Sequence, residues 1–172
     1  LDDRSMIGRK LGGFEVRGKL GEGAMGSVYV ALQASLEREV ALKILDPALP
    51  LKGKTLEDFR RTMQIVARMD HPNIVRVFEA GYQDPYHFVA MELVDGHSAR
   101  ELVWGTGPLG EEELLMIGKG VLHALSGAAT AGIVHNGIKP ANIFVPRNGP
   151  PKLSDLGYPG SLRRGVAGKR GD

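Results

Sequence analysis

Residues 21–28 read Gly-Glu-Gly-Ala-Met-Gly-Ser-Val, which sets three glycines in the spacing G-x-G-x-x-G. This spacing can open the helix of a dinucleotide-binding unit, or it can turn the chain between two strands. The flanking residues favour the turn, because Phe14-Glu15-Val16 and Val28-Tyr29-Val30 are both prone to form strands. We therefore predict a glycine turn between strands at 14–20 and 27–33, whose bare backbone amides can cover a phosphate. The alternative is an ordinary glycine-rich hairpin.

Further strands are predicted at 39–45, 74–80 and 87–93 from short runs of apolar and β-branched residues. Between them, residues 55–69 carry Leu56, Phe59, Met63 and Val66 at helical spacing, which predicts an amphipathic helix that ends at His71-Pro72. The first half of the chain should thus form a sheet with one helix.

After Asp95-Gly96 the pattern becomes helical. Ser98 with Glu101 is a capping-box signature for a short helix that reaches Trp104. Residues 111–131 predict a long buried helix with acidic residues in its first turn. Its apolar positions are Leu114, Ile117, Gly118, Val121, Leu122, Leu125 and Ala128. Residues 143–145 and 152–154 predict a small hairpin.

Residues 135–142 read His-Asn-Gly-Ile-Lys-Pro-Ala-Asn, and Asp155-Leu156-Gly157 begins thirteen residues after Asn142. Four stretches resemble, in chain order, four motifs of protein kinases. Residues 21–28 resemble the glycine loop, Val40-Ala41-Leu42-Lys43 resembles V-A-I-K, residues 135–142 resemble H-R-D-x-x-x-x-N, and 155–157 resemble D-F-G. Residues 59–64 in addition resemble a segment of bacterial serine/threonine kinases. The resemblance covers residues 12–157.

That resemblance implies an α+β, protein-kinase-like fold. Residues 12–94 would be the N-lobe, a five-stranded antiparallel sheet with one helix, and 95–157 a truncated, mainly helical C-lobe. The family continues after D-F-G with an activation segment and further helices, whereas only 15 residues follow Gly157 here. We predict that residues 158–172 form a flexible tail.

The resemblance also implies a nucleotide site. Lys43 would reach the phosphates, Met91 would be the gatekeeper, and Asn142 with Asp155 would bind Mg²⁺. The nucleotide-contacting positions would be Gly21, Gly23, Gly26, Val28, Ala41, Lys43, Met91, Glu92, Val94 and Phe144. Val66, Val77, His135 and Leu156 would stack as an apolar spine, so His135 is interpreted as a packing residue.

Two positions depart from the family pattern. Gly137 stands where kinases carry the Asp that accepts the substrate proton, beside Asn136 in place of Arg. Thr62 stands where the helix Glu would pair with Lys43, so we expect Lys43 either to stay solvated or to turn to Asp155. Lys139 is retained, but a protonated ammonium has no lone pair with which to act as a base.

Composition and net charge limit the classes of partner that the chain is expected to bind. The net charge of +2 gives no support for nucleic-acid binding. The absence of cysteine excludes disulfides and indicates a cytoplasmic protein. No apolar run reaches the ~18–20 residues of a membrane span. Because the 111–131 helix would normally pack on further kinase helices, we expect exposed apolar surface there, or a protein partner that covers it.

The leading hypothesis is therefore a pseudokinase, a signalling or scaffold module that binds protein, or binds ATP and Mg²⁺ weakly or not at all, and transfers no phosphate. The first alternative is an active serine/threonine kinase, or a fragment of one, with an unusual base. The second is a degenerate, partly folded relic without a ligand.

Overall fold

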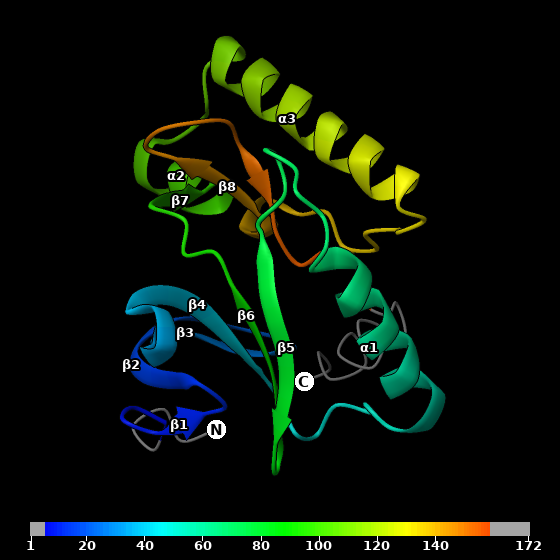
Figure 1. Cartoon of the computed structure of the whole chain (residues 1–172). Helices are drawn as coiled ribbons and strands as arrows, with labels where there is room; N and C mark the ends of the chain where they lie inside the picture. Colours follow the sequence, from blue (N-terminus) through cyan, green and yellow to red (C-terminus); the bar gives the residue numbers. More distant parts are fainter. Residues whose placement is uncertain (1–5, 159–172) are drawn as a thin grey trace, which may run out of the picture. The chain divides into compact units, whose positions relative to one another are not determined.

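The computed structural model describes residues 6–158 (Figure 1). Their backbone divides into two compact units, one made of 6–67 with 77–93 and the other of 68–76 with 94–158. No helix in this part of the chain is long and apolar enough to cross a membrane.

The first unit is built on an antiparallel sheet with strand order β1-β2-β3-β4-β6-β5. Its strands are β1 (Lys10–Leu11), β2 (Phe14–Gly23), β3 (Gly26–Gln33), β4 (Arg38–Leu45), β5 (Val77–Gln83) and β6 (Tyr86–Met91). A short 3-10 helix, η2 (Ala34–Leu36), joins β3 to β4, and α1 (Gly53–Val66) contacts β5. The predicted sheet with one helix is confirmed.

The sheet has one strand more than the five predicted. The chain turns at Gly12, where φ is +58°, and lays β1 antiparallel to β2. The Gln83 side chain holds this edge, because its Oε1 accepts from the Gly12 N–H at 2.7 Å and its Nε2 donates to the Lys10 carbonyl at 3.0 Å. A two-residue strand fixed by a distant side chain leaves no periodic signal in the sequence.

Two predicted boundaries were wrong. The helix spans Gly53–Val66 rather than 55–69. The strand predicted to start at Ile74 starts at Val77, because the preceding backbone is already paired with β9 (Lys152–Leu153). The Val75 N–H donates to the Leu153 carbonyl at 3.0 Å, and the Leu153 N–H donates to the Asn73 carbonyl at 2.8 Å.

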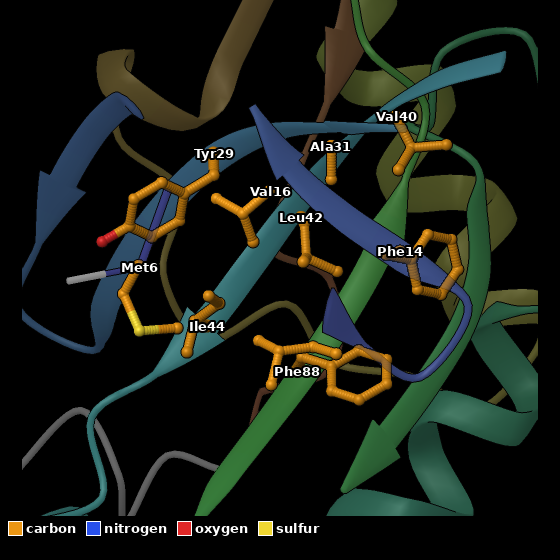
Figure 2. Packing of buried hydrophobic residues seen from close by; sticks show 11 residues of the cluster. Met6, Phe14, Val16, Tyr29, Ala31, Val40, Leu42, Ile44 and Phe88 are labelled. Atoms are coloured by element: carbon orange, nitrogen blue, oxygen red, sulfur yellow. The ribbon is translucent and has the colours of Figure 1, made fainter. Parts of the chain in front are cut away.

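One face of the sheet forms a closely packed apolar core (Figure 2). Alternate residues of β4, namely Val40, Leu42 and Ile44, are fully buried in it, as the period of two in a strand requires. Phe14 and Phe88 meet edge to face, with their ring centroids 6.0 Å apart. The rest of the cluster is Met6, Leu11, Val16, Tyr29, Ala31 and Ala90.

The second unit combines a three-stranded sheet, in the order β7-β8-β9, with helices. Its elements are β7 (Gly96–Ser98), α2 (Ala99–Thr106), α3 (Glu111–Thr130), the 3-10 helix η3 (Pro140–Asn142), β8 (Ile143–Pro146) and β9. The predicted hairpin is confirmed as β8 and β9, with Ile143 opposite Leu153. Strand β7, which pairs with β8, was not predicted.

Helix α3 has the predicted length but is not buried along its length. Its buried positions, Ile117, Gly120, Ala124 and Ala128, form one stripe of mostly small residues. The helix contacts β8 and β9, while several of its large apolar side chains are exposed: Leu114, Leu115, Met116 and Leu122. The prediction of exposed apolar surface is therefore confirmed, and that of a buried helix was wrong.

Helix α2 begins with the predicted capping box. The Glu101 N–H donates to the Ser98 Oγ at 3.2 Å, and the Ser98 N–H donates to the Glu101 carboxylate at 2.7 Å. We expect Ser98→Ala to lower the free energy of unfolding by about 1 kcal/mol, the usual cost of a lost N-cap. Urea denaturation measures this, with Ser126→Ala on the exposed side of α3 as a control that should not destabilise.

The same variant should change the dependence on pH. The hydrogen bonds from the Ser98 backbone and hydroxyl lower the pKa of Glu101 below its ordinary 4.5. A carboxyl group with a lowered pKa stabilises the fold above its unfolded pKa, and that contribution disappears as the pH falls through the folded pKa. The variant keeps the backbone bond and loses only the bond from the Ser98 hydroxyl to the Glu101 carboxylate, so its cost should be smaller at pH 3 than at pH 7. An equal cost would contradict the hydroxyl–carboxylate bond.

Candidate functional site

The glycine stretch turns the chain between β2 and β3, as predicted, and it opens no helix. Gly23 pairs with Gly26 at the end of the ladder, with Ala24 and Met25 between them. Met25 is buried, and its carbonyl accepts from the Asp46 N–H at 3.0 Å. This arrangement contradicts the dinucleotide-binding alternative, in which the third glycine would pack inside a helix.

The three glycines have different reasons to be glycine. At Gly26 φ is +136°, and a Cβ would lie 2.0 Å from the Ile44 carbonyl oxygen, so the sheet itself requires this glycine. At Gly21 a Cβ would meet nothing within 4 Å, and at Gly23 only the Gly26 carbonyl oxygen at 4.0 Å. Open space over Gly21 and Gly23 suits a backbone that approaches a phosphate closely.

Several predicted nucleotide contacts lie on one face of the sheet. Val28 is opposite Lys43 in the β3–β4 ladder, and Ala41 is opposite Met91 in the β4–β6 ladder. Paired residues share a face, and Ala41 and Lys43 are two residues apart, so the four share the face opposite the Val40–Leu42–Ile44 side of β4. Glu92 and Val94 follow β6 and are half-buried.

Lys43 itself is only 6% exposed, so the first of its two expected states, a solvated ammonium, was wrong, and a turn toward Asp155 stays a prediction. A buried ammonium is costly unless it is paired or hydrogen-bonded. Burial of the lysine in the middle of β4 is thus a feature that its sequence position did not reveal.

The hydroxyl group of Thr62 is hydrogen-bonded within its own helix, α1. Its Oγ1 donates to the Asp58 carbonyl at 2.8 Å, and the residue is half-buried on α1. The acidic residues of α1, Glu57 and Asp58, are both exposed. The structure therefore offers no carboxylate on α1 at the Thr62 position.

The second unit carries the other predicted site residues, in the segment that follows α3. That helix ends in a Schellman motif, because the Ile133 N–H donates to the Ala128 carbonyl at 2.9 Å and the Gly132 N–H to the Ala129 carbonyl at 2.9 Å. Gly132 has φ of +72°, which glycine adopts without strain. The motif directs the chain into the buried Ile133 and the loop at 135–142.

His135 anchors this loop as a packing residue. Its ring is 2% exposed, its Nε2 lies 2.8 Å from the Ser154 carbonyl, and its Nδ1 accepts from the Gly137 N–H at 3.2 Å. The acceptor role of Nδ1 assigns the proton to Nε2, which donates to Ser154. With both nitrogens occupied by backbone groups, the ring has no free nitrogen for acid–base chemistry.

The predicted metal pair is joined by backbone bonds. The Ser154 N–H donates to the Asn142 carbonyl at 2.8 Å, and this bond holds Asp155, the next residue, near Asn142. The Asn142 side chain is 5% exposed, and its Nδ2 donates to the Gly137 carbonyl at 3.0 Å, which directs its other polar atom, the amide oxygen, elsewhere. Asp155 is half-buried with φ of +61°, an uncommon conformation for a residue other than glycine. An amide oxygen and a carboxylate are ligands that Mg²⁺ accepts, so the residues fit the ion.

Gly137 leaves the centre of this loop without a functional group. Its backbone is held on both sides, by His135 and by Asn142, although the side chain that the loop carries in active kinases is absent. Asn136 is exposed with φ of +60°, and its amide donates to the Val134 carbonyl at 3.2 Å. Lys139 is exposed. The loop is thus fully formed, but Asn136, Gly137 and Lys139 offer no proton acceptor.

The remaining predicted residues are placed as follows. Phe144 lies half-buried on β8, opposite Ser98 and Lys152. The four predicted spine residues are all buried: Val66, Val77, His135 and Leu156. Tyr158, assigned by prediction to a flexible tail, is 2% exposed, while the rest of that tail lies outside the described residues. Ser154, which joins both halves of the loop network, was missed, because a serine before Asp155 carries no signal of its own.

The geometry agrees with comparisons to known proteins. Residues 14–169 match the family model of the protein kinase domain. The chain is 35% identical over 158 residues to the serine/threonine-protein kinase PrkC of Bacillus subtilis, covering 91% of this chain and 24% of that protein. It is 42% identical over 156 residues to the probable serine/threonine-protein kinase SCO3848 of Streptomyces coelicolor, covering 87% and 23%.

A solved structure is similar as well. The crystal structure of the Mycobacterium tuberculosis PknI kinase domain matches with a TM-score of 0.81 and 30% identity, covering 92% of this chain and 66% of that one. The chain spans about a quarter of the length of PrkC and of SCO3848, 24% and 23% respectively. It belongs to the protein kinase family.

Proposed function

We propose that this chain is a pseudokinase module, which binds ATP and Mg²⁺ weakly and a protein partner through its second unit, and which transfers no phosphate. The observation that carries the proposal is Gly137. The loop around it keeps its hydrogen bonds through His135, Asn142 and Ser154, whereas the position of the base holds no side chain. Loss of a general base costs about 10²–10⁴ in rate.

Retained residues support nucleotide binding. Gly21 and Gly23 leave space for phosphates, Lys43 supplies a buried positive charge, and Asn142 with Asp155 would hold Mg²⁺. Mg²⁺-ATP, when bound, carries the phosphoryl group that kinases transfer. Thr62 weakens this site, because a hydroxyl donating to its own helix cannot neutralise or position an ammonium.

The module is therefore expected to bind ATP with an affinity weaker than micromolar. If Kd is about 100 μM, 1 mM ATP adds about 1.4 kcal/mol to the free energy of unfolding, which a thermal-shift assay detects. Lys43→Ala should abolish the shift, and Lys54→Ala, which removes an exposed lysine of α1, should leave it unchanged. Omission of Mg²⁺ should reduce it.

Other outcomes of this experiment would count against the account. Micromolar or tighter binding that depends on Lys43 would mean that Thr62 is no handicap to the site. Binding that survives Lys43→Ala would place the nucleotide elsewhere.

Protein binding is supported by helix α3. Leu114, Leu115, Met116 and Leu122 are between 44% and 66% exposed, more large apolar surface than one helix normally leaves in water. We assign this face to a protein partner. A signalling or scaffold role in the cytoplasm belongs to the same proposal.

An active kinase is the second candidate. Lys43, Asn142 and Asp155 favour it, because they match the phosphate and metal positions of the family. It would require a base from outside the 135–142 loop. A phosphotransfer assay separates the two candidates.

A further inference from the structure

Helix α3 carries a second stripe of residues beside its buried one. From Leu115 onward these residues follow one another at intervals of three, four, three and four, the spacing that joins two helices in a coiled coil. We call this set the α3 seam, and its members are Leu115, Gly118, Leu122, Leu125 and Ala129. Leu115 is 55% exposed and Leu122 66%. Gly118 and Ala129 are exposed too, and Leu125 is half-buried.

The seam faces away from the residues that hold α3 in its unit. The buried stripe of α3 runs from Ile117 to Ala128, and the helix contacts β8 and β9 (Figure 1). At about 100° per residue, the centre of the seam lies about 135° around the helix from the centre of that stripe. Within residues 6–158, α3 can therefore accept a second helix on the seam and keep its packing on β8 and β9.

Gly118 makes a hollow in the seam. Glycine in the interior of a helix is destabilising relative to alanine. A Cβ at Gly118 would meet nothing within 4 Å, so packing within the described part of the chain does not require a glycine there. Such a hollow suits a large side chain that enters from a second helix.

The seam itself supplies a side chain that fits the hollow. If two copies of α3 lie antiparallel with residue 120 opposite residue 120, Gly118 of each copy faces Leu122 of the other, and Leu115 faces Leu125. A parallel pair would instead place Gly118 on Gly118 and leave a void, which is destabilising. The order of large and small residues along the seam thus fits a second copy in the antiparallel direction.

The charges of α3 favour the same direction. Its first turn carries three glutamates, Glu111, Glu112 and Glu113. A parallel pair would bring two such sets of carboxylates together, whereas residues 126–131, which they approach in the antiparallel pair, contain no charged residue. Lys119 is the exception, because it flanks the middle of the seam and would lie near Lys119 of the second copy.

We propose that α3 pairs with α3 of a second copy of this chain, antiparallel and along the seam. The inference names the protein partner to which the proposed function assigns α3, so it rests on that part of the proposed function. It does not depend on ATP binding or on the absence of phosphate transfer. Five residues from each copy make a small interface, so we expect a Kd of about 10–100 μM.

Self-association is measured by sedimentation velocity of the purified chain between about 2 and 500 μM, a range that brackets this Kd. The sedimentation coefficient should rise with concentration from that of the monomer to that of the dimer and then stay constant. A chain that remains monomeric throughout, or that continues to larger species, would contradict the pairing.

Three variants test the seam. Leu122→Gln should weaken the dimer more than tenfold, because each dimer loses two leucines from its centre. Met116→Gln is the matched control, since Met116 is also exposed on α3, at 44%, but lies outside the seam, and its Kd should stay within about twofold of the parent value. Lys119→Gln should strengthen the dimer about twofold, because it removes the like charges at the centre.

The direction of the pair is tested by a spin label. The chain has no cysteine, so Glu112→Cys provides a single attachment point at an exposed residue. Residue 112 lies eight residues from residue 120, so the two labels of an antiparallel dimer should be about 25 Å apart, and those of a parallel dimer about 10 Å. Pulsed electron paramagnetic resonance measures this distance.

Each result supports or contradicts the proposal. A dimer that survives Leu122→Gln, or that Met116→Gln weakens equally, would place the interface elsewhere. Labels about 10 Å apart would contradict the antiparallel register. Thermal unfolding at low concentration shows that each variant is folded. The ATP shift and the phosphotransfer assay do not depend on the seam, so they report separately on the rest of the proposed function.

Discussion

Gly26→Ala should destabilise the first unit by about 3 kcal/mol or more. Two costs add, because φ of +136° is strained for any residue with a Cβ, and that Cβ would lie 2.0 Å from the Ile44 carbonyl oxygen and 2.9 Å from the Leu45 Cα. Both neighbours are backbone atoms of β4, which cannot move away as a flexible side chain could. Urea denaturation monitored by circular dichroism measures the loss.

Gly21→Ala is the matched control from the same motif. A Cβ there meets nothing within 4 Å, so the cost should stay below about 1 kcal/mol. If the two substitutions cost the same, the structural account of the motif is wrong. Because Gly21→Ala leaves the fold intact, any effect it has on ATP binding reports on the phosphate contact alone.

The elements predicted best carry local signals. Residues prone to form strands on both sides of the glycines fixed the turn, and Ser98 three residues before Glu101 fixed the start of α2. The start of α3 followed from its acidic first turn. Each of these signals lies within a few residues of the feature that it predicts.

What escaped prediction depends on distant residues. Strand β1 is held by Gln83, and the start of β5 is delayed by pairing of Val75 with Leu153. The helical periodicity of α3 identified a helix but could not show which face is covered, and the covered face proved to be its small residues. The burial of Lys43 depends in the same way on tertiary packing. So do the hydrogen bonds through which Ser154 connects His135 with Asn142.

The second large prediction concerns catalysis: the chain should transfer no detectable phosphate from ATP to a protein. Asn136 is a neutral amide, Gly137 has no side chain, and both nitrogens of His135 are hydrogen-bonded to backbone groups. Loss of the general base lowers the rate of phosphate transfer by about 10²–10⁴, and we expect the remaining rate to lie at the background of the assay.

Gly137→Asp alone should not restore transfer. Gly137 is not among the described glycines with positive φ, so an aspartate can adopt its φ. The variant would still have Thr62, whose hydroxyl donates to Asp58 of its own helix, where the partner of Lys43 is needed. Full activity from the single substitution would show that the Thr62 position does not limit the enzyme.

The central claim is tested most directly by incubating the purified chain with γ-³²P-ATP, Mg²⁺ and a generic acceptor protein, alongside Asp155→Ala prepared identically. The account predicts that both proteins give the same signal as the buffer control. Incorporation of label by the parent chain that disappears in Asp155→Ala would contradict it and would establish the chain as an active kinase.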